Sequence, residues 1–319
     1  MADYIPSLEQ VQVGLEAVWG DLAAPSVQLV GIESCKITPH VESSQIFDKR
    51  GSTMPAYIAV VNKVSAEADV SGAVAYSHLK YWLDGMFGID AGLGPYAYLA
   101  ELTPTTALQS FNLCYGQPDV TYSMGGAIID RLNITGDSNS YLKFSAHLQG
   151  KGTVTDTLEA LTDDDVVIAM GNHCKLYIDP IAGPIGTTPV LTTAFSFDAN
   201  IVCDRKLMWH LGGLNPDSLR HGKWGGSLKL ILEMTSDMQD ILDDVIAQEV
   251  SPGGYAVRIE ATDALTTSVF TLDFAGQILS APIMFTDHDG VTTAELDFVP
   301  VFSSDVTFMS CWGAALELP

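Results

Sequence analysis

The chain contains one order of expected secondary-structure elements twice, and this repetition limits its fold more than any other feature. In the first half, a short strand over residues 64–70 is followed by an amphipathic helix over 73–87. Three further strands come next, and a hairpin at 136–139 then leads into a closing strand over 140–150. Strands far outnumber helices, which predicts a mainly β fold.

The second half has the same order at a nearly constant distance along the chain. It begins with a strand over 227–234 and a helix over 237–248, and its hairpin lies at 287–290. Gly126 and Gly276, which open corresponding strands, are 150 residues apart. Because order and spacing are both shared, the sequence predicts a tandem duplication of one unit.

Most of the expected strands alternate apolar and polar side chains with a period of two. Segments 107–115 and 268–274 are examples, and the pattern is typical of antiparallel strands with one buried face. The two helices instead have apolar residues at three- and four-residue spacing, so each is expected to pack one face on a sheet. These residues are Ala75, Leu79, Trp82, Leu83 and Met86 in the first helix, and Met238, Ile241, Leu242, Val245 and Ile246 in the second.

We expect two domains of nearly equal length. Residues 1–160 comprise an N-terminal arm and the first domain, and residues 161–319 comprise the second, with a seam near 163–165. A length of 319 residues suits two domains, and a hydrophobic content of 47% allows each of them to build a core. Each domain is expected to have one flanking helix and one long loop.

The long loops are expected before the helices, at 43–57 and 204–225. Irregular loops of this length are uncommon in compact domains unless they have a function. They hold much of the sparse positive charge of an acidic chain, so we interpret them as sites of contact between subunits. The candidate contact residues are Phe47, Lys49, Arg50, Arg205, Lys206, Arg220, Lys223 and Trp224.

The charge balance argues against tight binding to nucleic acid. The chain has 15 Lys and Arg residues against 39 Asp and Glu residues, which gives a net charge of −24. Phosphate recognition needs the opposite sign, whereas an acidic surface keeps passing DNA from adhering. Only 17% of the residues are charged, and this low value indicates a surface that partner subunits cover.

No residue pattern in the sequence indicates catalysis. Motifs of nucleophilic hydrolases, P-loops, zinc proteases and dinucleotide-binding folds are absent. The adjacent His173 and Cys174 point to opposite faces of an extended strand, which argues against a nucleophile pair. The acidic segments 162–166 and 287–290 supply too few ligands for a calcium loop. We therefore expect no enzyme activity, no cofactor and no metal site.

The cysteines and the N-terminus bear on the compartment. Five cysteines without CxxC spacing favour reduced thiols over disulfides or a zinc site. Residues 1–12 lack the basic and apolar regions of a signal peptide. No apolar run is long enough for a membrane-spanning helix. The expectation is a protein made in the cytoplasm, without a membrane partner.

The first half of the chain also resembles the tail tube proteins of phages with long, non-contractile tails. The resemblance covers about residues 12–150 and rests on motifs that stand in the family's order. They are the arm Gln12-Val-Gly-Leu-Glu-Ala-Val-Trp-Gly-Asp-Leu-Ala-Ala-Pro25, the strand 37–42, Arg50-Gly-Ser52, Ala68-Asp-Val-Ser-Gly72, Gly85-Met-Phe-Gly88, Tyr96-Ala-Tyr98, Ser110-Phe111 and Gly125-Gly-Ala127. The second half joins through the internal repeat only, because it lacks a clear arm and has a larger loop.

The resemblance implies a structural virion protein of a phage tail, made in the cytoplasm of the bacterial host. The implied fold is mainly β, with two tandem β-sandwich or β-barrel tail-tube domains. Inner strands of neighbouring subunits join in that family into one barrel around a channel, through which DNA passes without specific binding. Single-domain members form hexamers, so a duplicated chain is expected to form trimeric rings with pseudo-sixfold symmetry, and hexameric rings are the second choice.

The implied partners are further copies of the chain in helically stacked rings, and the tape-measure, tail terminator and distal tail proteins. Acidic residues of alternating strands are the candidates for the channel wall, namely Glu67, Asp69, Glu233 and Glu260. Three alternatives stay open at this point. They are another virion part such as a tail completion, terminator or decoration protein, the tube of a contractile injection system, and a glycan-active enzyme, for which the sequence shows no carboxylate pair.

Overall fold

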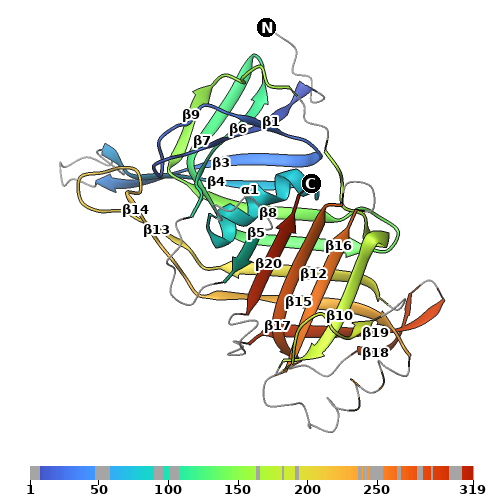
Figure 1. Ribbon diagram of the computed structural model, residues 1–319. Coiled ribbons are helices and arrows are strands. Elements are labelled where there is room, and N and C mark those ends of the chain that lie inside the picture. The colour runs from blue at the N-terminus through green and yellow to red at the C-terminus, as the bar shows by residue number, and fades with distance from the viewer. Residues whose placement is uncertain are drawn as a thin grey trace.

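The computed structural model is built almost entirely of antiparallel strands in two layers, which confirms the mainly β prediction (Figure 1). The residues that the structure describes are 8–46, 58–89, 96–100, 108–162, 166–181, 183–190, 194–235, 239, 241, 243, 254–263, 267–278, 283–288, 290–301 and 311–318.

Four strands of the first half form one side of a sandwich. Their order is β3 (Ile32–Ile46), β4 (Ile58–Ala73), β8 (Lys143–Gly150) and β7 (Val120–Asp137), and each neighbouring pair is antiparallel. Alternate side chains point to the two faces, so one face of this first four-strand set is apolar and the other polar.

Four strands of the second half have the same order. They are β12 (Ala194–Cys203), β15 (Trp224–Glu233), β19 (Val291–Pro300) and β18 (Ile283–His288). The two sets are joined side by side, because β7 of the first pairs with β12 of the second from Arg131 to Asp137. The result is one continuous inner sheet in which the same strand order occurs twice.

An outer layer covers the apolar face of the first set. Its strands are β2 (Val27–Leu29), β1 (Gln10–Leu15), β6 (Phe111–Gln117) and β9 (Gly152–Asp156), together with the first part of β7. The strand β7 can belong to both layers because it turns at Gly126, whose φ of +66° is accessible to glycine.

The N-terminal arm fastens this corner. The buried carboxylate of Glu16 accepts hydrogen bonds from the backbone N–H of Gly126 at 2.8 Å and of Gly20 at 2.7 Å. The indole of Trp19 donates to the carbonyl of Gly126 at 2.9 Å. A side chain at position 126 would lie 2.9 Å from the Trp19 ring nitrogen, so the arm and the corner require each other.

A second outer layer covers the apolar face of the second set. Its strands are, in order, β11 (Pro189–Val190), β10 (Cys174–Pro180), β16 (Tyr255–Thr262), β17 (Val269–Ile278), β20 (Trp312–Glu317) and β5 (Tyr96–Leu99). A short 3-10 turn, η2 (Gly171–His173), precedes β10. Because β5 comes from the first half of the chain, this layer also ties the two halves together.

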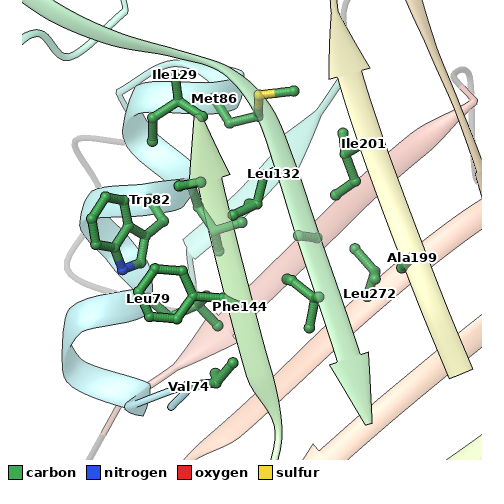
Figure 2. Close-up of a cluster of buried hydrophobic side chains, with 14 of the residues drawn as sticks. Val74, Leu79, Trp82, Met86, Ile129, Leu132, Phe144, Ala199, Ile201 and Leu272 are labelled. Atoms are coloured by element: carbon green, nitrogen blue, oxygen red, sulfur yellow. The ribbon is translucent and has the colours of Figure 1, made fainter. Parts of the chain in front are cut away.

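The helix α1 (Tyr76–Phe87) lies over the inner sheet, next to β8 and β5 (Figure 1). Figure 2 shows Trp82 beside Phe144, with ring centroids 4.9 Å apart, and Met86 near the seam with β12. The buried apolar side predicted from the sequence is confirmed. Within the second predicted helix, only Gln239, Ile241 and Asp243 are described, and they are helical.

Both predicted loops contain regular structure, which corrects the sequence analysis. The first four residues of the 43–57 loop belong to β3, where Ser43–Ile46 pair with Ile58–Val61 of β4. The 204–225 loop contains the hairpin of β13 (Lys206–Met208) and β14 (Ser218–Arg220). The prediction that Gly126 and Gly276 open strands is also wrong, because β7 continues through Gly126 and β17 continues through Gly276.

Candidate assembly surfaces

The inner sheet has an edge strand on each of its two sides, and each edge strand has one free edge among the described residues. Among the described strands, β3 pairs with β4 alone and β18 pairs with β19 alone. Unpaired edges offer backbone N–H and C=O groups to another strand, so proteins usually cover or blunt them. The free edges of β3 and β18 are therefore the first candidates for contact between subunits.

The strand β12 shows how such an edge looks when it is covered. Its side chains Ala199, Ile201 and Cys203 are buried on the apolar face, and β7 lies alongside. Figure 2 shows Ala199 and Ile201 facing the cluster that includes Leu132 and Leu272.

The corresponding side chains of β3 are open to solvent. The sequence repeat matches Ala146 of β8 with Leu296 of β19, 150 residues further along the chain. With this match, the strand registers put Ile37, Pro39 and Val41 at the places that Ala199, Ile201 and Cys203 have in β12. Ile37 is half-buried, Pro39 is exposed, and Val41 is 59% exposed. Exposed apolar patches mark interaction sites, so the strip of Ile37, Pro39 and Val41 is a candidate contact with another subunit.

Exposed apolar residues also continue along the β3–β4 hairpin, beyond the part that other strands cover. These residues are Val41, Ile46, Ile58, Val60 and Val61. The β13–β14 hairpin lies against the base of the same hairpin, where the N–H of Val64 donates to the carbonyl of Leu214 at 2.8 Å. Lys63 Nζ is 5.0 Å from the centre of the Trp209 ring.

The inner sheet turns its other face, here called the polar face, away from the core. Its acidic side chains are Glu42, Glu67, Asp69, Asp137, Asp198, Glu233, Glu295 and Asp297, and its basic ones are Lys36, Lys63, Arg131, Lys143 and Lys229. The acidic surplus gives the polar face a negative potential. Three of the four channel-wall candidates, Glu67, Asp69 and Glu233, lie on it.

Glu260, the fourth channel-wall candidate, does not lie on the polar face of the inner sheet. It stands on β16 in the outer layer, where it pairs with Lys175 of β10 at 3.6 Å between charged atoms. Alternation alone cannot tell which of two sheets a strand belongs to, because both sheets of a sandwich have one exposed face.

Arg205 is part of the interior, which corrects its place among the contact residues. Only 3% of it is exposed, and its guanidinium donates to the carbonyls of Gly85, Met86 and Ile129. Burial lowers the pKa of this side chain, and the nearby Asp130 opposes that effect. A cation at the end of α1 also stabilises the last carbonyls of the helix.

The other contact candidates stay at or near the surface. Lys206 pairs with Asp204 at 3.5 Å, and Arg220 and Lys223 are exposed. Trp224 is half-buried, because its ring stacks on Phe87 with centroids 5.2 Å apart. The candidates Phe47, Lys49 and Arg50 lie outside the described residues.

The described residues contain no group of three His, Cys, Asp or Glu side chains that could hold a metal ion. The five cysteines are free, and burial raises the pKa of Cys35, Cys114 and Cys174 to about 12, which keeps these thiols protonated. No helix in the described part of the chain is long and apolar enough to cross a membrane.

These features define a structural β protein whose inner sheet has two open edges and one acidic face. The comparison with protein families agrees, since a family model described as phage tail tube protein matches residues 7–308. The chain therefore belongs to the phage tail tube protein family, a family of structural virion proteins and not of enzymes. No curated protein matches the sequence.

Proposed function

We propose that the chain forms the hollow tube of a phage tail by pairing the β18 edge of one subunit with the β3 edge of the next. The observation that carries this proposal is the pairing of β7 with β12. That contact joins the last strand of one four-strand set to the first strand of the other. An equivalent pairing of β18 in one subunit with β3 in the next would continue the inner sheet from subunit to subunit.

A contact that repeats between identical subunits either closes a ring or continues as a filament. Each chain supplies two four-strand sets, so three chains supply the six sets of a pseudo-sixfold ring. The open apolar strip of Ile37, Pro39 and Val41 supports this pairing, because a neighbouring subunit would cover it as β7 covers the edge of β12. A ring of six chains is the second choice.

The polar face of the inner sheet lines the channel in this proposal. Glu67, Asp69 and Glu233 then belong to a wall whose net charge has the sign of DNA phosphates. Like charges repel at distances up to about 8 Å at physiological salt, which is enough to keep a passing duplex from adhering. DNA therefore moves through the tube without specific binding.

The two hairpins at one end of the inner sheet carry the contacts between stacked rings. The β3–β4 hairpin extends past the covered part of the sheet, and the β13–β14 hairpin lies against its base. Lys206, Arg220, Lys223 and Trp224 belong to this region, and Phe47, Lys49 and Arg50 remain candidates on sequence grounds. The tail terminator and distal tail proteins bind the ends of the stack, and the tape-measure protein occupies its channel.

The experiment is to follow purified protein at rising concentration by sedimentation velocity and negative-stain electron microscopy. We expect hollow tubes that lengthen above a critical concentration. Closed rings that never stack would contradict the tube and favour a tail completion or decoration protein. A chain that remains monomeric with tube fragments present as seeds would contradict the edge pairing as well.

A further inference from the structure

A groove opens along the first half of the molecule, between β3 and the outer layer. Its volume is about 450 Å³, and its lining residues are Cys35, Lys36, Ile37, Pro39, Tyr115, Tyr122 and Thr153. The β3 residues Ile37 and Pro39 belong to the open apolar strip, and the two tyrosines come from β6 and β7 of the outer layer. The groove is thus the open side of the first sandwich.

The opposite edge of the inner sheet carries an exposed aromatic side chain. Phe285 of β18 is 72% exposed, and its φ of +60° is a rare value for any residue other than glycine. Its neighbour Thr286 pairs with Thr293, which lies on the side of the polar face. The register between β18 and β19 shifts between Ile283 and Thr286, so Phe285 lies at an irregularity of this edge strand. Irregularities of this kind re-aim a side chain and are common at sheet edges.

We propose that Phe285 of one subunit inserts into this groove of the next subunit and anchors their contact. The inference rests on the proposed edge pairing and names the side chain that stabilises it. A phenylalanine buries a large apolar area when it fills a pocket, and such aromatic anchors dominate interfaces. The strained backbone at Phe285 is also of the kind that proteins retain at functional positions.

The seam inside the chain supplies the template for this contact. Across it, Ile134 of β7 pairs with Ala199 of β12, and both are fully buried. The β18 strand corresponds to β7, and Ile37 of β3 corresponds to Ala199. In the proposed pairing, the part of β18 that contains Phe285 would lie beside Ile37, which lines the groove.

The first test compares the critical concentration for tube assembly of Phe285→Ala with that of the parent chain. We expect a rise of at least about tenfold, because an interface anchor is lost. The control is Leu99→Ala, which removes an exposed apolar side chain of the outer layer, and it should assemble like the parent. Phe285→Leu should retain most of the assembly. Equal critical concentrations for Phe285→Ala and the parent would overturn the proposal.

The second test is disulfide cross-linking in tubes of parent protein that contain minor fractions of Phe285→Cys and Pro39→Cys chains. A covalent dimer that forms only when both variants are present would support the contact. Tubes that contain both variants but form no such dimer would overturn the groove contact and leave the tube function intact. If the parent chain forms no tubes at all, the proposed function fails, and this inference fails with it.

Discussion

Arg205 is the residue through which the second half of the chain holds the helix of the first. Its guanidinium reaches from the end of β12 to the carbonyls of Gly85 and Met86 in the last turn of α1. It also donates to the carbonyl of Ile129, next to an irregularity in β7. One side chain therefore stabilises the helix end and the seam of the inner sheet together.

Replacing Arg205 by methionine is expected to destabilise the chain. The variant removes the guanidinium that donates to three backbone carbonyls, which costs about 1–3 kcal/mol for each carbonyl left unsatisfied, although removal of a buried charge offsets part of that loss. Urea unfolding measures the difference. Arg220→Met is the matched control, because Arg220 is exposed and its loss should change stability by less than about 0.5 kcal/mol. Equal effects of the two substitutions would contradict the assigned role of Arg205.

Asp179 gives a pH-dependent prediction. Burial opposes its ionisation, but hydrogen bonds from Thr187, Thr188 and Gly186 outweigh this effect and lower its pKa. A lowered pKa in the folded state stabilises the protein above the unfolded value of about 3.9, and this contribution is lost as the pH falls through the folded value. The Asp179→Asn variant should therefore be less stable than the parent at neutral pH.

The difference between Asp179→Asn and the parent should shrink in acid, because the parent carboxylate is then protonated as well. Urea unfolding at neutral pH and at about pH 2 tests both parts of the prediction. A stability difference that stays constant over this range would show that the charge of Asp179 contributes nothing.

At the residue scale, the sequence predicted the buried face of a helix correctly but did not predict the burial of a single charged side chain. It identified the apolar side of α1 correctly, because helical spacing distinguishes one face from the other. It placed Arg205 at a subunit contact because the chain around it is basic. The acceptors of Arg205 are backbone carbonyls of distant segments, and such acceptors have no signature in the sequence.

At the scale of elements, the edge strands differ most from what the sequence predicted. The residues of β3 beyond Glu42 pair with β4 although both of their faces are exposed. A strand with water on both sides has no reason to alternate, so the periodicity that predicts half-buried strands fails there. The open strip of Ile37, Pro39 and Val41 does alternate, and comparison with β12 could have drawn attention to it.

Equivalent substitutions in β3 and β12 test whether the two strands correspond. Ile201→Glu places a carboxylate in the core and should destabilise the folded chain by more than about 3 kcal/mol. Pro39→Glu at the corresponding place in β3 should leave the unfolding of the isolated chain nearly unchanged, because Pro39 is exposed.

The same Pro39→Glu variant should fail to assemble, since its carboxylate would be buried against the next subunit. Thermal unfolding measures the first effect and sedimentation measures the second. Normal tubes from Pro39→Glu would contradict the use of β3 as a subunit contact.

At the scale of the whole molecule, the acidic polar face predicts how a tube treats DNA. Reversing Glu67, Asp69 and Glu233 together to lysine should make assembled tubes retain duplex DNA in a salt-dependent manner, whereas parent tubes retain none. The control is Glu260→Lys, which changes the charge on the outer layer. DNA co-sedimentation at low and high salt gives the comparison, and retention by parent tubes would contradict a repelling channel.

The order of elements that the sequence repeats is also present in the inner sheet, where each half contributes four strands in the same order. The division into two domains stays a prediction. The structure shows two contacts that the spacing of elements could not predict. The strands β7 and β12 continue one sheet, and β5 crosses to the outer layer of the other half. Both contacts join strands that lie far apart in the chain. Periodicity reports local structure only, so a single sequence gives no signal for such pairings.

The most direct test of the account is the rotational symmetry of assembled tubes seen end-on by electron microscopy. Three chains with two corresponding sets each should give a sixfold ring with threefold modulation. That result would support the step from β18 to β3 as a repetition of the step from β7 to β12. A sixfold ring without modulation, containing six chains, would keep the tube but contradict the claim that one chain occupies two positions.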